Sequence, residues 1–147
     1  MINKEQFSLY LNKVNINAPG IKGPTPYRGV EELIDVMFEM EFASVEWSNP
    51  NIRFIDRCFG FGTFLYFTYL KLLRYHDEAH ILNNMLYGIE IEKFRYTLTK
   101  KKLNIKNLYW GDSLNPTDKT KEILNMDFDH HQKMFDIPYQ LVFQKIM

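Results

Sequence analysis

The chain has 147 residues, of which 46% are hydrophobic, and its 18 Lys and Arg residues balance its 18 Asp and Glu residues. This size and composition predict one compact soluble domain over residues 1–147. Because Cys58 is the only cysteine, the sequence excludes a disulfide scaffold and favours a reducing, cytoplasmic setting. A net charge of zero attracts no nucleic acid by itself. We therefore expect any contact with DNA to come from a local patch or from another chain.

The sequence gives no sign of a membrane segment. Its longest run without a charged residue, 58–70, has 13 residues and contains two glycines. A spanning helix needs roughly 20 apolar residues. The charged start of the chain also lacks the apolar segment of a signal peptide, so we expect neither a membrane anchor nor secretion.

The first predicted helix follows a rigid loop. Gly20, Gly23 and Pro24 lead into Thr25 and Pro26, a pair typical of a helix N-cap and its first turn. Apolar residues at helical spacing then predict a helix over 27–40.

Further along the chain, strands alternate with helices. We expect strands at 52–55, 86–91 and 107–110, and helices at 63–75, after 78 to about 84, and at 92–102. In the helix at 63–75, the apolar side chains that fall on one side are Phe64, Phe67, Leu70 and Leu73. The alternation predicts an α/β fold with parallel strands and helices on both faces of the sheet.

An acidic residue stands at or near the carboxyl end of each predicted strand: Asp56, Glu90 and Asp112. Ligands of open parallel sheets bind at that edge. Gly60 and Gly62 follow Asp56 and let a ligand approach the backbone at the start of the next helix, which favours a carboxylate. An acid ahead of the glycines suits a cationic head, so the two features together suit a zwitterionic amino acid.

A nicotinamide cofactor fits this pattern poorly, because the third glycine of its fingerprint would fall on Leu65. The two later acids fit a nucleoside instead. Glu90 can accept both hydroxyls of a ribose, and Asp112 can accept a proton from an exocyclic amine. The three acids together predict a pocket for S-adenosylmethionine.

Residues 25–114 resemble the cofactor half of a known family, the S-adenosylmethionine-dependent DNA methyltransferases that methylate the N6 amine of adenine in restriction-modification systems. The resemblance is carried by four segments: Thr25-Pro26-Tyr27, Asp56 with Gly60 and Gly62, Leu86-Tyr87-Gly88-Ile89-Glu90, and Gly111-Asp112-Ser113-Leu114. Arg57 departs from the proline that this family usually has after its first acid. The resemblance implies a partial Rossmann-like methyltransferase sheet with S-adenosylmethionine as its cofactor. It implies these cofactor contacts: Thr25, Pro26, Asp56, Phe59, Gly60, Gly62, Glu90 and Asp112.

The resemblance breaks down where catalysis would begin. The family next has a polar residue, two prolines and an aromatic residue, which hold the flipped adenine. The candidates here are Asp136, Pro138 and Tyr139. Either they form this motif with Ile137 in place of the first proline, or the preceding strand has been deleted and Pro138-Tyr139 is a remnant. We favour the deletion, because no apolar run suited to a buried strand lies between 125 and 136.

The sequence therefore predicts a truncated methyltransferase-like domain in which residues 115–147 form a degenerate catalytic-loop region. Two functions stay open. One is methyl transfer to adenine N6 in DNA, with little or no activity of this chain alone. The other is a non-catalytic relative that acts through protein contacts, as a homodimer or with a full-length methyltransferase. Because no fourth strand is evident, we expect the strand at 52–55 to be covered by residues 136–145 or by a second chain. We expect DNA to bind only weakly or through a partner.

Two other features are given ordinary interpretations. His76 and His80 do not predict a zinc site, because no glutamate directly follows the first histidine, so no metal is expected. The three lysines at 100–102 are interpreted as a solvated helix end.

Overall fold

The computed structural model describes residues 1–17, 36, 39, 45–126 and 128. Most of the helix predicted at 27–40 lies outside these residues, as do the candidate site residues Thr25, Pro26, Asp136, Pro138 and Tyr139.

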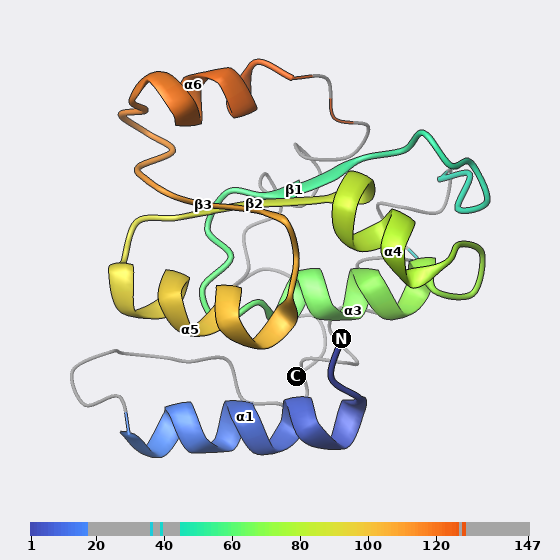
Figure 1. Ribbon diagram of the computed structural model, residues 1–147, viewed down its shortest axis with the longest axis horizontal. Helices are drawn as coiled ribbons and strands as arrows, with labels where there is room; N and C mark the ends of the chain where they lie inside the picture. Colours follow the sequence, from blue (N-terminus) through green and yellow to red (C-terminus); the bar gives the residue numbers. More distant parts are fainter. Residues whose placement is uncertain (18–35, 37–38, 40–44, 127, 129–147) are drawn as a thin grey trace.

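Three parallel strands form an open sheet within the described part of the chain (Figure 1). They are β1 (Phe54–Asp56), β2 (Leu86–Glu90) and β3 (Asn107–Trp110), in the spatial order β1-β2-β3. Asp56 pairs with Gly88, and Glu90 pairs with Trp110, so the carboxyl ends of the strands lie at one edge. The predicted α/β class with a partial Rossmann-like sheet is confirmed.

Helices cover both faces of this sheet (Figure 1). The helical elements are α1 (Lys4–Asn17), α3 (Thr63–Leu72), α4 (Glu78–His80), the π-helical η1 (Ile81–Met85), α5 (Lys93–Leu103) and α6 (Asp118–Leu124). α3 and α5 lie against one face, α6 covers the other, and α1 forms an outer layer beyond α3 and α5. None of the described helices is long and apolar enough to cross a membrane.

Side chains of the strands alternate between two apolar clusters, as the twofold period of a strand requires. Phe54 and Leu86 join a large cluster with α1, α3 and η1. Ile55 and Ile89 point to the opposite face, where they pack with Ile123 of α6. The sheet is thus buried on both faces, which is typical of parallel sheets.

Burial of α3 extends beyond the side on which the sequence places Phe64, Phe67, Leu70 and Leu73. Leu65, Tyr66 and Leu72 are all fully buried, whereas Leu73 just beyond the helix is 43% exposed. The cause is α1, whose Phe7 ring stacks on Tyr66 with centroids 4.0 Å apart. Because α3 lies between the sheet and α1, it is buried on more than one side.

Element boundaries differ from the prediction by a few residues. α3 ends at Leu72 rather than 75, and the helical stretch predicted up to 84 is the short α4 followed by η1. β1 begins two residues later than predicted, and β3 has the predicted bounds. The helices α1 and α6 were not predicted.

The outer edge of β3 is protected by Lys100 of α5. Its Nζ donates hydrogen bonds to the backbone carbonyls of Lys106, at 3.0 Å, and Leu108, at 3.3 Å. Charged side chains placed on an edge strand discourage pairing with another strand. Lys100 therefore satisfies part of an edge that would otherwise be free to recruit a neighbour.

Candidate functional site

The parallel sheet brings the three predicted acids to one edge. Asp56 ends β1, Glu90 ends β2, and Asp112 lies two residues beyond β3. Asp56 and Asp112 are half-buried, and Glu90 is 3% exposed. All three acids lie close enough to Cys58 to affect its thiol. Desolvation raises the pKa of this thiol most, and the negative charges of Asp56, Glu90 and Asp112 raise it further.

Glu90 ties the glycine loop to the next helix. Its Oε1 accepts a hydrogen bond from the backbone N–H of Gly60 at 2.9 Å, and its Oε2 accepts one from the N–H of Glu92 at 2.7 Å. Glu92 in turn caps α5 by accepting from the N–H of Arg95. The buried carboxylate is therefore satisfied by backbone donors and holds the loop in place.

The two glycines of the loop have different roles. Both are left-handed, with φ of +57° at Gly60 and +86° at Gly62. A Cβ at Gly62 would lie 2.3 Å from Cδ1 of Leu103, so this position allows the loop to pack on α5. A Cβ at Gly60 would meet nothing within 4 Å. The backbone at Gly60 thus borders open space, where a ligand can approach.

Asp56 is an acid in an unfavourable place. Burial raises the pKa of Asp56 to about 6, and the negative charge of Glu90 also raises it. The N–H of Cys58 donates a hydrogen bond to Oδ1 at 3.0 Å, which lowers the pKa and so partly offsets the rise. Groups perturbed in this way concentrate at functional sites. Asp56 is thus held partly desolvated beside the loop that has open space at Gly60.

Further hydrogen bonds join the loops that follow the strands. The N–H of Phe59 donates to the carbonyl of Ile89 at 3.2 Å. The Ser113 hydroxyl, from the loop after β3, donates to the carbonyl of Arg57 at 2.8 Å. Thr99 of α5 donates to the carbonyl of Gly60 at 2.8 Å. The backbone around the three acids is therefore fixed from several sides.

Phe59 and Asp112 have local roles in the structure. The Phe59 ring is 3% exposed and packs in the core beneath β2, where a Cβ at Gly88 would lie 2.6 Å from it. Asp112 accepts a hydrogen bond from the N–H of Leu114 at 2.9 Å and so shapes the turn after β3.

Three side chains that the sequence analysis passed over also lie at this edge. Ile91 and Leu114 are 63% and 87% exposed, and they stand next to Glu90 and two residues after Asp112. Arg95 places its guanidinium 5.8 Å from the centre of the Phe61 ring in the glycine loop. The sequence analysis placed Ile91 inside the strand predicted at 86–91, whereas β2 ends at Glu90 and leaves Ile91 exposed.

Among the described residues, no group of three His, Cys, Asp or Glu side chains is placed to hold a metal ion. The candidate residues Thr25, Pro26, Asp136, Pro138 and Tyr139 lie outside the described part of the chain, so the site consists here of the loops after β1, β2 and β3. A scan against models of known protein families finds no match for this chain, and a search of curated proteins finds no relative.

Proposed function

We propose that the carboxyl edge of the sheet binds S-adenosylmethionine, in the manner of a DNA adenine-N6 methyltransferase, with little or no methyl transfer by this chain alone. The observation that carries the proposal is the meeting of Asp56, Glu90 and Asp112 around a glycine loop whose Gly60 borders open space. An edge with three acids favours a cationic, hydroxyl-rich ligand over a pyrophosphate.

The amino-acid end of this ligand suits the loop after β1. Asp56 would pair with its ammonium group. The N-terminus of α3 follows Gly62 and has no side-chain cap, so its first-turn N–H groups favour a carboxylate. Opposite charges of a zwitterion thus meet opposite charges of the loop.

The nucleoside end suits the loops after β2 and β3. Each oxygen of Glu90 accepts one backbone hydrogen bond and retains a second lone pair for a ribose hydroxyl. Ile91, 63% exposed, offers an apolar surface to the face of an adenine, and Asp112 can accept from its exocyclic amine. The adenine-N6 chemistry itself depends on Asp136, Pro138 and Tyr139, so methyl transfer remains a prediction from the sequence.

Calorimetric titration of the full chain with S-adenosylmethionine and S-adenosylhomocysteine at pH 7.5 tests the proposal. Asp56→Asn and Glu90→Gln should each weaken binding by about tenfold or more, the scale of a hydrogen bond to a charged group. Glu5→Gln on α1 removes the same charge from an exposed position in the outer layer and should leave affinity unchanged. Unchanged affinity in both site variants, or no binding by the folded protein, would contradict the proposal.

One observation favours the second candidate, a binding protein that works with another chain. In the part of the chain that the structure describes, β1 pairs with β2 alone, and no described strand lies along its other edge. We propose a homodimer or a methyltransferase partner for this edge. Transfer of a tritiated methyl group onto mixed-sequence DNA by the chain alone favours the first candidate, whereas transfer that is found only with the partner present favours the second.

A further inference from the structure

Charge is unevenly distributed along this neutral chain. Residues 93–124, which span α5, β3 and α6, hold eight Lys and Arg residues against three Asp and Glu, a net charge of +5. Since the whole chain sums to zero, the remainder carries −5. This segment therefore carries the excess of positive charge that a local patch for nucleic acid needs.

A groove concentrates this charge at the free edge of β3. It has a volume of about 470 Å³ and runs between α5 and α6, which lie on opposite faces of the sheet at the β3 side (Figure 1). Its cationic and aromatic lining consists of Lys100, Lys106, Lys119, Tyr96, Tyr109 and Trp110. Such a mixture of ammonium groups and rings offers contacts both for phosphates and for bases.

The rings and the lysines are already arranged in pairs. The ammonium of Lys93 lies 5.2 Å from the centre of the Trp110 ring, and that of Lys119 lies 5.6 Å from the Tyr109 ring. Trp110 is nevertheless 54% exposed, and its Nε1 donates to the carbonyl of Ile91 at 2.9 Å, which holds the ring in place. A base that stacks on this ring would therefore bring its phosphate within reach of a lysine.

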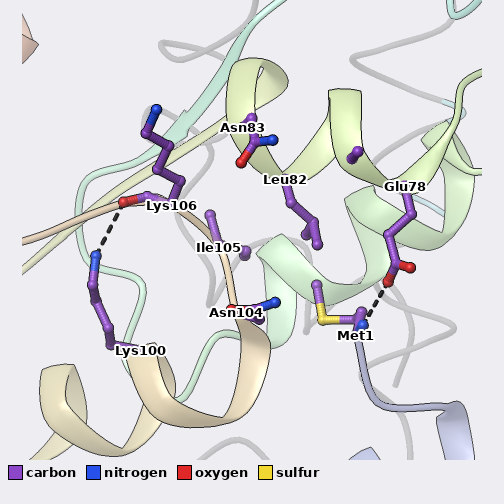
Figure 2. A pocket seen from close by; sticks show the side chains of 9 residues that line it. Met1, Glu78, Leu82, Asn83, Lys100, Asn104, Ile105 and Lys106 are labelled. Atoms are coloured by element: carbon purple, nitrogen blue, oxygen red, sulfur yellow. Dashed lines mark hydrogen bonds and ion pairs between the residues drawn. The ribbon is translucent and has the colours of Figure 1, made fainter.

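Among the residues that the structure describes, no carboxylate forms an ion pair with Lys100, Lys106 or Lys119. Burial, and then the charge of Lys119, lower the pKa of Lys100. Figure 2 shows the Lys100 ammonium directed at the Lys106 carbonyl. The Lys106 ammonium points away from that carbonyl and from the Lys100 ammonium. Burial raises the pKa of Tyr109 most, and the negative charge of Glu122 on α6 also raises it, so this acid lies near the groove. An anion in the groove would relieve the repulsion between the lysines.

A second cavity of about 560 Å³ shares Lys100 and Lys106 with the groove (Figure 2). It is lined by Glu78 and by the amides of Asn83 and Asn104 as well, so it mixes both signs of charge and offers no aromatic ring. Of these two cavities, only the groove along β3 combines cations with exposed aromatic rings.

We infer that the groove along the free edge of β3 binds single-stranded nucleic acid, with phosphates at Lys106 and Lys119 and a base stacked on Trp110. A duplex keeps its bases stacked on one another and cannot offer one to Trp110, whereas an unpaired strand can. An acidic peptide would pair with the lysines but would offer no base to stack on the aromatic rings. This site is separate from the proposed cofactor contacts at Asp56 and Glu90.

The test is fluorescence anisotropy of the full chain with a labelled 12-nucleotide oligothymidylate. We expect a Kd of about 10⁻⁴ to 10⁻⁶ M at physiological salt, and a slope of log K against log salt near −1.4, from about −0.7 for each of the two phosphates contacted. Trp110→Ala should weaken binding at least about fivefold, and Trp110→Phe, which keeps a ring, should restore most of it. Circular dichroism checks that both variants fold.

A pair of lysines on one helix provides the matched control. Lys119→Ala should weaken binding and flatten the salt slope by about 0.7. Lys121→Ala removes the same charge from an exposed residue of α6 that does not line the groove, and should have a much smaller effect. Equal losses in the two variants would overturn the inference, and so would duplex DNA or polyglutamate binding as tightly as the oligonucleotide.

Discussion

Replacing Asp56 by Asn should make the protein more stable at neutral pH. Burial and the charge of Glu90 raise the pKa of Asp56 from 3.8 to about 6. Between these values the folded chain holds a proton that the unfolded chain has lost. The free energy of unfolding therefore falls as pH rises from about 4 to about 6. Above about 6 the folded state bears the full cost of a charged carboxylate at this buried position.

The size of the effect follows from the two pKa values. They lie about 2 pH units apart, which corresponds to at most about 3 kcal/mol. Because the side chain is half-buried and partly screened by water, we expect a gain of about 1 to 3 kcal/mol for Asp56→Asn at pH 7.5. The Asn side chain has the same shape, and its carbonyl oxygen can still accept from the N–H of Cys58.

Urea denaturation of both proteins, followed by tryptophan fluorescence at pH 7.5 and pH 4, measures this difference. The gain should be present at pH 7.5 and nearly absent at pH 4, where the wild-type carboxyl is protonated when folded. If Asp56 binds a cationic ligand, the same variant should lose that ligand while it gains stability. An acidic residue that lowers the stability of the fold is expected where the function requires its charge.

Glu78 provides a control with the opposite sign. The amino group of Met1, followed by the Tyr69 hydroxyl, lowers the pKa of Glu78, so its carboxylate stabilises the fold at neutral pH and loses that effect as pH falls. Glu78→Gln should therefore be slightly less stable than the wild type at pH 7.5, by less than about 1 kcal/mol for so exposed a group. The reasoning is refuted if Asp56→Asn is no more stable than the wild type at pH 7.5, or if its gain is as large at pH 4.

Three further predictions concern the loop, the sheet edge and assembly. Gly60→Ala should lower the free energy of unfolding by about 1 kcal/mol, because its backbone is left-handed. Gly62→Ala should lower it by about 2 to 4 kcal/mol, because its Cβ would also meet Leu103. Equal losses of stability in urea denaturation would contradict this prediction. Lys100→Met should lose about 1 to 3 kcal/mol with its bonds to the β3 carbonyls and should aggregate more readily in light scattering. Multi-angle light scattering of the wild type at micromolar concentration should give a dimer, because no described strand pairs with the outer edge of β1, and a strict monomer would exclude self-association through that edge.

Much of the core sheet was predictable from the sequence because its cues are local. Apolar runs that end at an acid or a glycine predicted all three strands, and β3 has the predicted bounds. The convergence of Asp56, Glu90 and Asp112 also followed from the sequence, because parallel strands place their carboxyl ends at the same edge. The helix α1 was missed although Phe7, Leu11 and Val14 stand at helical spacing.

Other properties depend on neighbours that are distant in the sequence, and only the tertiary structure decided them. The tight packing at Gly62 depends on where Leu103 lies, 41 residues further along the chain. The burial of α3 on more than one side depends on α1, and the raised pKa of Asp56 depends first on its burial and then on the charge of Glu90. The basic groove was hidden in a net charge of zero, because lysines from α5, the segment before β3, and α6 come together only when those elements pack around one strand edge. Local patterns determine which elements form, whereas burial, electrostatics and the shape of a site are properties of the elements after they have packed.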